Sequence, residues 1–554
     1  MIFPSPAHCR GTEIEFKSCK AVCLYGADAA FAAELFMRNG FAVDENAQTV
    51  ISLGFSSTRE LTYIEQARRI SDEKFNIKSE LTDDRLNISV TYAHRHGLYY
   101  AVNRIIRGLR AEKVLIGEIE DYPLFDKRGY IEGFYGKPWN AQQREQTLEL
   151  LASYGMNTYY YAPKDDPYHR DKWRELYPAQ ELENLARLCR LCGENFVDFN
   201  YCIAPGLSMK YSSEGEYQAL FCKVKQLYSV GVRGFGLLLD DIPERLYYEE
   251  DCIRFDYETV NAHIYLANRL YADLKALDAN THLTVCPLVY YGRGDEYYVS
   301  RLGKGIEPCV DLFWTGHNIC SQELSVPEAI LFEQATNHRA LYWDNFPVND
   351  AEMQNEMHLG CITGRDEGLY LYSRGLISNT MEYCLSSRIP LLTVADYLWN
   401  PTAYNARESW KNALKIVLGA NAESFEYFAD NLFFSCLKQE NSSIFNSAAA
   451  RAQAEIFAGN TEKAIHIFTD YLQKLHCCCD FLRGEGEILG ELSRWISKQL
   501  LACEILDGCA AVLCGKGDKS AVEALLNSYL RLPEVLYDFS FECFVREVLT
   551  LDGH

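Results

Sequence analysis

The hydrophobic pattern of residues 1–122 alternates between short strand-like and helix-like segments. The β-branched run at 49–54 predicts a strand, and the runs at 75–80 and 86–92 predict a hairpin. Apolar residues at helical spacing over 97–109 predict a helix. Together these segments predict a small α/β domain at 1–122. The segment shows no cluster of acids, histidines or cysteines, so we interpret it as a structural or packing domain.

From residue 123 to 385 the pattern changes to strand, loop and helix, repeated. The predicted strands are 128–133, 157–162, 196–203, 234–240, 282–288, 310–315, 340–343 and 368–371. Eight strand–helix units over this length predict an α/β fold, a (β/α)8 TIM barrel. An open doubly wound sheet is the alternative, but no G-x-G-x-x-G motif follows any of the strands.

Residues 386–554 show the 3.6-residue period of helices. The periodic stretches are 409–418, 422–436, 448–458, 464–475, 489–506, 521–530 and 535–549. Glycine and asparagine separate them, as is typical of helix ends. We therefore expect a C-terminal all-helical domain at 386–554, packed on the barrel.

The apolar run at 234–239 ends in two adjacent carboxylates, Asp240 and Asp241, and Pro243 follows. A strand buried on both faces has no structural need to end in two acids. Neighbouring acids suit acid–base chemistry, in which one carboxyl donates a proton and the other stays charged. The alternative interpretation is a solvated strand end or a helix N-cap.

The other predicted barrel strands also end in residues suited to binding. In a (β/α)8 barrel the carboxyl ends of the strands form the functional face. The segments at these ends are EGFYG (132–136), APKDD (162–166), APG (204–206), YYG (290–292), WTG (314–316), WDN (343–345) and SN (378–379). Aromatic, amide, small and acidic residues at so many successive strand ends favour a functional site over packing.

Composition limits the ligands that such a site would bind. The formal net charge of −23 repels phosphate backbones and anionic membranes, so we expect no nucleic-acid and no membrane partner. No stretch reaches about 18 uninterrupted apolar residues, and the first residues lack a basic and apolar leader. The sequence therefore predicts a cytoplasmic protein. A site rich in aromatics and acids suits neutral polar ligands such as sugars.

The 21 cysteines form no repeated framework and are interpreted as free thiols of a reducing compartment. Cys189 and Cys192 make a lone C-x-x-C on a helical stretch, without a second pair at zinc spacing. We therefore expect no metal and no cofactor.

Several motifs resemble those of one enzyme family. They are RGYIEGFYGKPW (128–139), NTYYYAPKDDPYHR (157–170), LLLDDI (237–242), LYWDN (341–345) and YLWNPTAYNARESW (397–410). They resemble glycoside hydrolase family 84, the O-GlcNAcase and bacterial hyaluronidase-like β-N-acetylglucosaminidases. The resemblance runs through the barrel, is weaker over the first 120 residues and does not extend to about the last 120.

The resemblance implies a retaining exo-β-N-acetylglucosaminidase that works by substrate-assisted catalysis through an oxazoline intermediate. In this chemistry the acetamido oxygen of the sugar is the nucleophile, so the protein supplies none. The resemblance implies that Asp240 orients the acetamido N–H and offsets the charge of the forming oxazolinium. It implies that Asp241 is the general acid and base. Successive strand residues point to opposite faces, so the backbone must leave regular β geometry at or just after Asp240.

On the acetamido side, the resemblance implies that Tyr290 donates a hydrogen bond to the acetamido oxygen. Trp343 resembles the wall against the acetyl methyl group. Asn345 resembles an amide that helps to hold the catalytic aspartate, and Thr315 is expected to line the acetyl pocket.

On the hydroxyl side, Gly133 and Lys164 resemble residues that contact a sugar hydroxyl. Asp350 and Asn379 resemble residues that bind the ring and exocyclic hydroxyls of a terminal sugar. Binding these hydroxyls would restrict cleavage to terminal β-linked GlcNAc.

Two other functions stay open at this point. One is a catalytically inactive GlcNAc-binding barrel protein. The other is a metal-dependent hydrolase that uses Asp165, Asp166 and His169 with the central pair, although these residues lack the histidine-rich spacing of a metal site. The expected partner is a GlcNAc-bearing glycoprotein or oligosaccharide, and the sequence carries no prediction of the oligomeric state.

Overall fold

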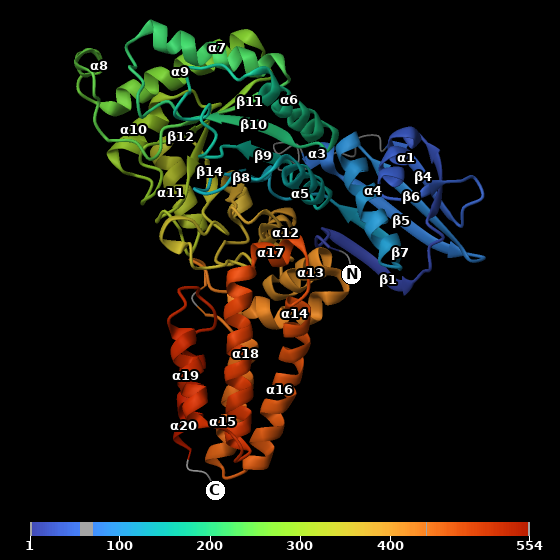
Figure 1. Cartoon of the computed structure of the whole chain (residues 1–554). Coiled ribbons are helices and arrows are strands. Elements are labelled where there is room, and N and C mark those ends of the chain that lie inside the picture. The colour runs from blue at the N-terminus through green and yellow to red at the C-terminus, as the bar shows by residue number, and fades with distance from the viewer. Residues whose placement is uncertain (1–2, 56–69, 439, 552–554) are drawn as a thin grey trace.

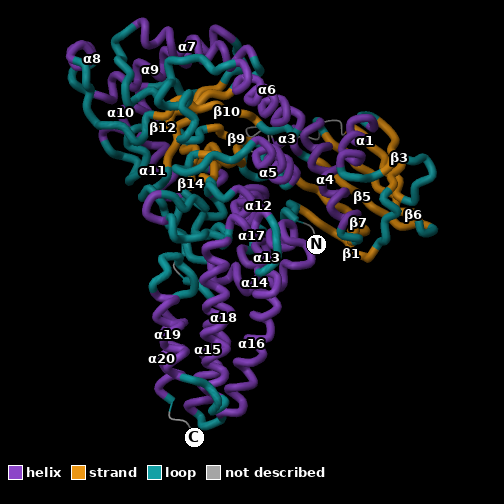
Figure 2. The backbone as a smooth tube through the Cα atoms, in the orientation of Figure 1, coloured by secondary structure: helices purple, strands orange, loops and turns teal. Residues whose placement is uncertain are grey.

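The computed structural model describes residues 3–55, 70–438 and 440–551. Figure 1 shows an α/β sheet unit beside a barrel, with the C-terminal helices projecting away from both as a stalk. Figure 2 shows the strands gathered in the sheet and the barrel, whereas the stalk is helical.

The first unit is a mixed sheet in the order β1-β7-β5-β6-β4-β2-β3. Its strands are β1 (His8–Glu15), β2 (Ala21–Gly26), β3 (Ala42–Val43), β4 (Thr49–Phe55), β5 (Phe75–Thr82), β6 (Arg85–Tyr92) and β7 (Lys113–Asp121), and its helices are α1 (Ala29–Arg38), α3 (Ile70–Glu73) and α4 (Arg95–Arg110). The predicted hairpin is β5–β6, which pair antiparallel. Its two turn residues, Asp83 and Asp84, have φ angles of 48° and 60°, as a type I′ turn requires.

The barrel closes in the order β10-β11-β12-β13-β14-β15-β8-β9, and all its strand pairs are parallel. The strands are β8 (Lys127–Glu132), β9 (Thr158–Tyr161), β10 (Asp198–Ile203), β11 (Gly234–Leu238), β12 (His282–Cys286), β13 (Asp311–Trp314), β14 (Ala340–Asp344) and β15 (Ser373–Asn379). The helices around them are α5 (Ala141–Ser153), α6 (Ala179–Glu194), α7 (Glu214–Ser229), α8 (Glu249–Arg254), α9 (Thr259–Leu277), α10 (Tyr297–Gly305), α11 (Val326–Thr336) and α12 (Cys384–Trp399). The predicted (β/α)8 barrel is therefore confirmed.

The prediction for the last barrel strand was wrong. Residues 369–371 form a short 3-10 helix, η2 (Leu369–Leu371), and the eighth strand is β15. The apolar run at 368–371 resembled a strand because of its composition alone. In the true strand, Arg374 and Gly375 interrupt the apolar pattern. Arg374 reaches out to Asp311 at 3.1 Å, and a Cβ on Gly375 would lie 2.1 Å from the carbonyl oxygen of Lys127.

Buried polar contacts attach the sheet unit to the barrel. Arg128 of β8 is fully buried, and its Nη2 donates to Glu73 Oε1 of α3 at 2.6 Å. Trp399 at the end of α12 donates from Nε1 to Asp121 Oδ1 of β7 at 2.9 Å. A buried ion pair that loses one partner costs about 3–5 kcal/mol, so the Arg128–Glu73 pair strongly favours this arrangement of the two units.

The C-terminal region is helical as predicted. It comprises α13 (Ala406–Leu418), η3 (Gly419–Asn421), α14 (Ala422–Ala429), η4 (Asp430–Leu432), α15 (Ser443–Phe457), α16 (Thr461–Leu482), α17 (Glu487–Glu491), α18 (Ser493–Leu513), α19 (Lys519–Leu530) and α20 (Phe539–Thr550). Trp399, Trp410 and Trp495 lie in the core. The three predicted domain ranges stay a prediction. Most of α12 lies beyond the predicted domain boundary at residue 385, and this helix contacts α5 and β8 of the barrel. Among the helices described, none has both the length and the apolar character that crossing a membrane requires.

Candidate active site

The central feature is the end of β11, where the chain turns out of the sheet. Gly234–Leu238 is buried throughout, and Leu239 still donates its N–H to the carbonyl of Cys286 at 2.9 Å. The strand thus ends before Asp240, two residues earlier than predicted. Asp241 has a φ of 51°, in the left-handed region that aspartate tolerates better than most residues. The expected departure from β geometry therefore lies at Asp241.

This bend brings both carboxylates to the same ammonium group. Lys164, from the loop after β9, places its Nζ 3.4 Å from Asp240 Oδ2 and 4.0 Å from Asp241 Oδ2. On a regular strand the two side chains would point to opposite faces and one lysine could not approach both. Burial lowers the pKa of Lys164, but Asp240, Tyr135 and Asp241 together raise it above its usual value. Lys164 therefore stays charged between the acids.

The two acids differ in exposure and in partners. The side chain of Asp240 is 9% exposed and that of Asp241 is 36% exposed. Among the residues that the structure describes, Asp240 Oδ1 has no hydrogen-bond partner although it is buried. A buried carboxylate oxygen without a donor is costly, so this atom is placed to accept a hydrogen bond from a ligand.

Two tyrosines contact the more exposed acid. Tyr135 OH donates to Asp241 Oδ2 at 2.8 Å, and Tyr290 OH donates to Oδ1 at 3.4 Å. Burial, followed by the charges of Asp241 and Asp240, raises the pKa of Tyr290, so it remains a hydroxyl donor. Arg170 completes the group: its Nη1 donates to Tyr135 OH at 3.0 Å and its Nη2 to the carbonyl of Asp241 at 3.2 Å.

A second network joins the ends of β14, β15 and β8. Asn345 Oδ1 accepts from Trp343 Nε1 and from Asn379 Nδ2, both at 2.9 Å. Asn379 Oδ1 accepts from the N–H of Gly133 at 3.1 Å. A Cβ at Gly133 would lie 2.5 Å from the Trp343 ring, so only glycine allows this close approach.

The Asn345 side chain bonds to Trp343, Asn379 and the loop at Ile319. Its amide nitrogen donates to the carbonyl of Ile319 at 2.8 Å. Within the described part of the chain no hydrogen bond joins Asn345 to Asp240 or Asp241. Cys436, from the C-terminal helical region, contacts the carbonyl of Asn345 at 3.5 Å. The helical region therefore contacts this edge of the barrel directly.

The two remaining predicted residues hold loops. Asp350 Oδ2 accepts from the N–H of Tyr135 at 2.7 Å, and burial raises the pKa of this half-buried acid. Thr315 is buried; its hydroxyl donates to the carbonyl of Asn318 at 2.8 Å, and its N–H donates to the carbonyl of Tyr290 at 2.9 Å. Asp350 thus fixes the Tyr135 loop and Thr315 fixes the Tyr290 loop.

Tyr135 and Arg170 were not among the predicted site residues. Both lie inside motifs that carried the resemblance, at 128–139 and 157–170, so a signal was present. Their contacts with Asp241 span 106 and 71 residues of chain, respectively, and no local pattern encodes such distances.

The residues of the metal-hydrolase alternative do not converge. Asp166 Oδ2 accepts from Tyr161 OH at 2.9 Å and from Tyr177 OH at 2.6 Å. His169 is buried, with Nδ1 2.7 Å from the carbonyl of Cys202, and burial lowers its pKa to about 4. Over residues 3–55, 70–438 and 440–551, the acids around Asp240 form no group at metal-ligand distances.

Comparison with known proteins matches this architecture. The family model for beta-N-acetylglucosaminidase matches residues 128–430. The curated "Protein O-GlcNAcase" of Rattus norvegicus is 32% identical over 257 residues, covering 45% of this chain and 27% of the relative, and that of Mus musculus has the same values. The match thus spans about a quarter of the length of these curated relatives.

Solved structures cover more of the chain. A mutant of the O-GlcNAc hydrolase of Thermobaculum terrenum is 28% identical, with a TM-score of 0.73 over 77% of this chain and 95% of that chain. CpGH84B is 26% identical, with a TM-score of 0.83 over 99% of this chain and 100% of that chain. CpGH84D, at 20% identity and a TM-score of 0.78 over 99% of this chain and 98% of that chain, shares the fold. Since the family model alone matches more than half of the 554 residues, the chain belongs to the beta-N-acetylglucosaminidase family, glycoside hydrolase family 84.

Proposed function

We propose that this protein is a retaining exo-β-N-acetylglucosaminidase that removes terminal β-linked GlcNAc by substrate-assisted catalysis through an oxazoline. One observation carries the proposal: the backbone bend at Asp241 lets Lys164 contact both acids of one strand end. A site with a protein nucleophile places its two carboxyl groups about 5–5.5 Å apart, on opposite sides of the anomeric carbon. Adjacent acids turned to one side suit attack by the acetamido oxygen of the sugar instead.

Asp240 has the properties that the orienting acid needs. Its Oδ1 is buried and lacks a donor among the described residues, so it can accept the acetamido N–H. Its Oδ2 lies 3.4 Å from Lys164 Nζ, and this ion pair fixes the position of the carboxylate. A carboxylate fixed in a buried position stabilises the positive charge of the oxazolinium more strongly than water would.

Asp241 is suited to proton transfer because it is the more exposed acid. It would donate its proton to the leaving glycosidic oxygen and then take a proton from the attacking water. Tyr135 and Arg170 orient its carboxylate and its backbone. The Tyr290 hydroxyl, 3.4 Å from Asp241 Oδ1 without a ligand, would donate to the acetamido oxygen when a sugar binds.

The second network would hold the sugar itself. Trp343 and Thr315 would line the acetyl pocket, and Asn345 would position the Trp343 ring and the Asn379 amide through its own side chain. Gly133, Asn379, Asp350 and Lys164 would contact the sugar hydroxyls. The GlcNAc would be carried by a glycoprotein or an oligosaccharide; the relatives that carry the name O-GlcNAcase support the protein-bound sugar.

Hydrolysis of a nitrophenyl β-N-acetylglucosaminide tests the proposal. We expect turnover, a β-configured first product by proton NMR, and tight inhibition by a thiazoline analogue of the oxazoline. Binding of GlcNAc without any turnover would instead identify a sugar-binding barrel. Indifference to the thiazoline together with turnover would exclude substrate assistance. Hydrolysis rates for a glycopeptide and for oligosaccharides with the same terminal sugar then identify the carrier.

A further inference from the structure

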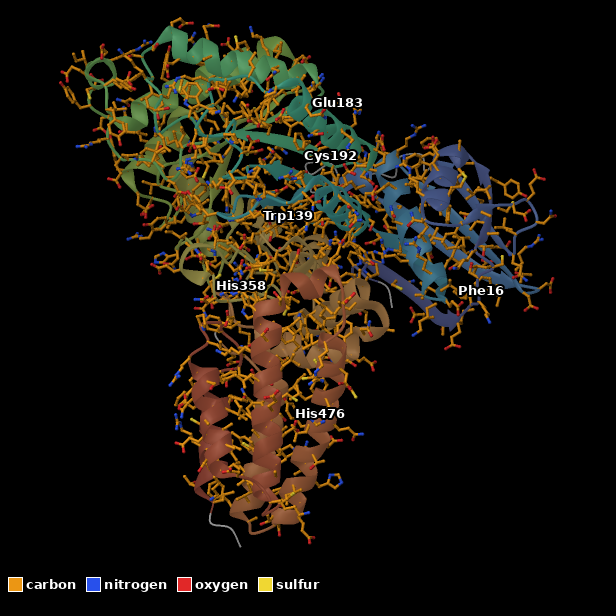
Figure 3. All side chains as sticks on the ribbon, viewed as in Figure 1. Phe16, Trp139, Glu183, Cys192, His358 and His476 are labelled. Atoms are coloured by element: carbon orange, nitrogen blue, oxygen red, sulfur yellow. The ribbon has the colours of Figure 1, made fainter. Side chains whose placement is uncertain are left out.

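A group of metal-ligating side chains lies in the stalk, away from the barrel. The helices α16 and α18 pack against each other there (Figure 1). His476 of α16 places Nε2 2.8 Å from Asp507 Oδ1 and 3.1 Å from Oδ2 of α18. The ligand atoms of His476, Asp507 and Cys503 all lie within 4.8 Å of one another. Figure 3 labels His476 partway along the stalk.

A fourth side chain, Cys479, lies beside this group. It interacts with Cys503, and both side chains are buried. Cys479 follows His476 by three residues on α16, and Asp507 follows Cys503 by four on α18. Residues at these spacings share one helix face. Each helix therefore presents a pair of potential ligands to the other.

We propose that His476, Cys479, Cys503 and Asp507 bind one divalent ion of the zinc type between α16 and α18. Two sulfurs, one imidazole and one carboxylate make a four-ligand set of the kind that zinc takes in tetrahedral sites. Binding requires both thiols to lose their protons to solvent, so the ion forms bonds to two thiolates, one neutral imidazole and one carboxylate.

A surface ion pair between His476 and Asp507 would account for these two residues but not for the neighbouring cysteines. The side chains of His476 and Asp507 are 49% and 47% exposed, and such surface pairs contribute about 0–1 kcal/mol. That pairing gives no reason for two neighbouring buried thiols directly beside it. Elsewhere in the described ranges, no three histidine, cysteine, aspartate or glutamate side chains approach one another at such distances.

A metal was not predicted from the sequence because the ligand pairs do not have short zinc-finger spacing. Here the pairs lie on separate helices, with Cys479 and Cys503 separated by a turn and by α17. The proposed ion would fasten the two long helices of the stalk to each other. It takes no part in the chemistry of the barrel, so this proposal stands or falls separately from the proposed function.

Cobalt titration of the full-length chain tests the site. The chain is reduced, freed of metal with a chelator, and titrated with Co²⁺. We expect one equivalent of Co²⁺ to give a thiolate charge-transfer band and the visible bands of tetrahedral cobalt, which Zn²⁺ then removes. We also expect Zn²⁺ to raise Tm, because an ion that binds only the folded state stabilises it.

Three variants localise the site. His476→Ala changes an exposed residue, so the variant should fold. It should weaken Zn²⁺ binding by more than the roughly 10- to 100-fold that is lost when a residue hydrogen-bonded to a metal ligand is removed. Cys503→Ser should reduce the charge-transfer band. Cys477→Ser, an exposed thiol on the same helix, is the matched control and should bind as the parent does.

The proposal is overturned if the reduced parent gives no thiolate band and no rise in Tm. It is equally overturned if His476→Ala and Cys503→Ser both titrate like the parent, since the ion then binds elsewhere. A Cys479–Cys503 disulfide in the untreated protein, with no ion bound after its reduction, would identify a redox pair instead.

Discussion

The roles proposed for Asp240 and Asp241 predict how the loss of activity in each variant depends on the leaving group. In Asp241→Ala the leaving oxygen departs without a proton. General acid catalysis is worth about 10²- to 10⁴-fold, so kcat/KM for a poorly acidic leaving group should fall by that factor. This corresponds to about 2.7–5.4 kcal/mol of transition-state stabilisation. A strongly acidic leaving group such as dinitrophenol needs no proton. For such a substrate the decrease in kcat/KM of Asp241→Ala should be far smaller.

The structure indicates that Asp241→Ala leaves the fold intact. The side chain is 36% exposed, and Lys164 keeps Asp240 as a partner at 3.4 Å. Asp240→Ala is the matched comparison at the next residue. Loss of an electrostatic group of this kind costs about 10²- to 10³-fold, and it should cost the same for every leaving group. Lys164 then retains Asp241 at 4.0 Å, so the loss of stability should stay below the roughly 3–5 kcal/mol of an isolated broken pair.

The assay is a series of aryl β-N-acetylglucosaminides with phenols of graded acidity. The logarithm of kcat/KM is plotted against the acidity of the phenol for the parent and both variants. We expect a steep slope for Asp241→Ala and the parental slope for Asp240→Ala. Azide, which attacks without a general base, should restore turnover of the dinitrophenyl substrate in Asp241→Ala only. Equal losses across the series in Asp241→Ala would refute the assignment of the acid.

Three further predictions concern the support of the site and the stability of the fold. Gly133→Ala places a Cβ 2.5 Å from Trp343 and should lower stability by about 1–3 kcal/mol and raise KM. Gly193→Ala, in α6 with open space around it, should leave KM unchanged and should not lower stability, because alanine favours a helix over glycine by about 0.5–1 kcal/mol. Equal melting temperatures of the two variants would contradict this prediction. Tyr135→Phe removes the hydroxyl that contacts Asp241 and Arg170 and should lower kcat/KM about tenfold, because a hydrogen bond to a charged group contributes about 1.5–3 kcal/mol and this one is half exposed. Tyr291→Phe removes the hydroxyl of an exposed tyrosine beside Tyr290 and is the control. Equal decreases in kcat/KM for the two variants would contradict the role of Tyr135. Burial raises the pKa of Asp396 from 3.8 to about 6, so the folded state holds this proton more tightly and stability should fall as pH rises from about 4 to 6. Denaturant titration measures the free energy of unfolding of the parent and of Asp396→Asn at each pH. The parent should lose about 3 kcal/mol relative to the variant across that window, and parallel plots of unfolding free energy against pH would contradict the prediction.

The barrel could be predicted because most of its strands are short apolar runs between glycine, proline and polar residues. Such runs are what burial on both faces requires. The eighth strand was not predicted because Arg374 and Gly375 interrupt its apolar pattern. Arg374 bonds to Asp311, and Gly375 lets its backbone lie against the carbonyl of Lys127. These residues satisfy neighbours that are distant in sequence, so their local pattern looks like a loop.

The candidate site was predictable to the same extent. The rule that function lies at the carboxyl ends of barrel strands places Asp240, Tyr290, Trp343 and Asn379 at one end, and the structure brings their strands together there. The rule says nothing about loops that fold back. The Tyr135 hydroxyl on Asp241 and the Cys436 thiol on the carbonyl of Asn345 both come from such segments.

The bend at Asp241 links the backbone to the chemistry. Two adjacent residues on a continuing strand would present one carboxylate to the barrel mouth and the other to the surrounding helices. The left-handed φ of 51° at Asp241 ends that alternation, and the shared contact with Lys164 shows the result. In the proposed mechanism, one strand end then supplies both acids to one side of the sugar, and the acetamido group of the substrate acts as the nucleophile. The backbone geometry of Asp241 is the feature on which this proposal of substrate assistance depends.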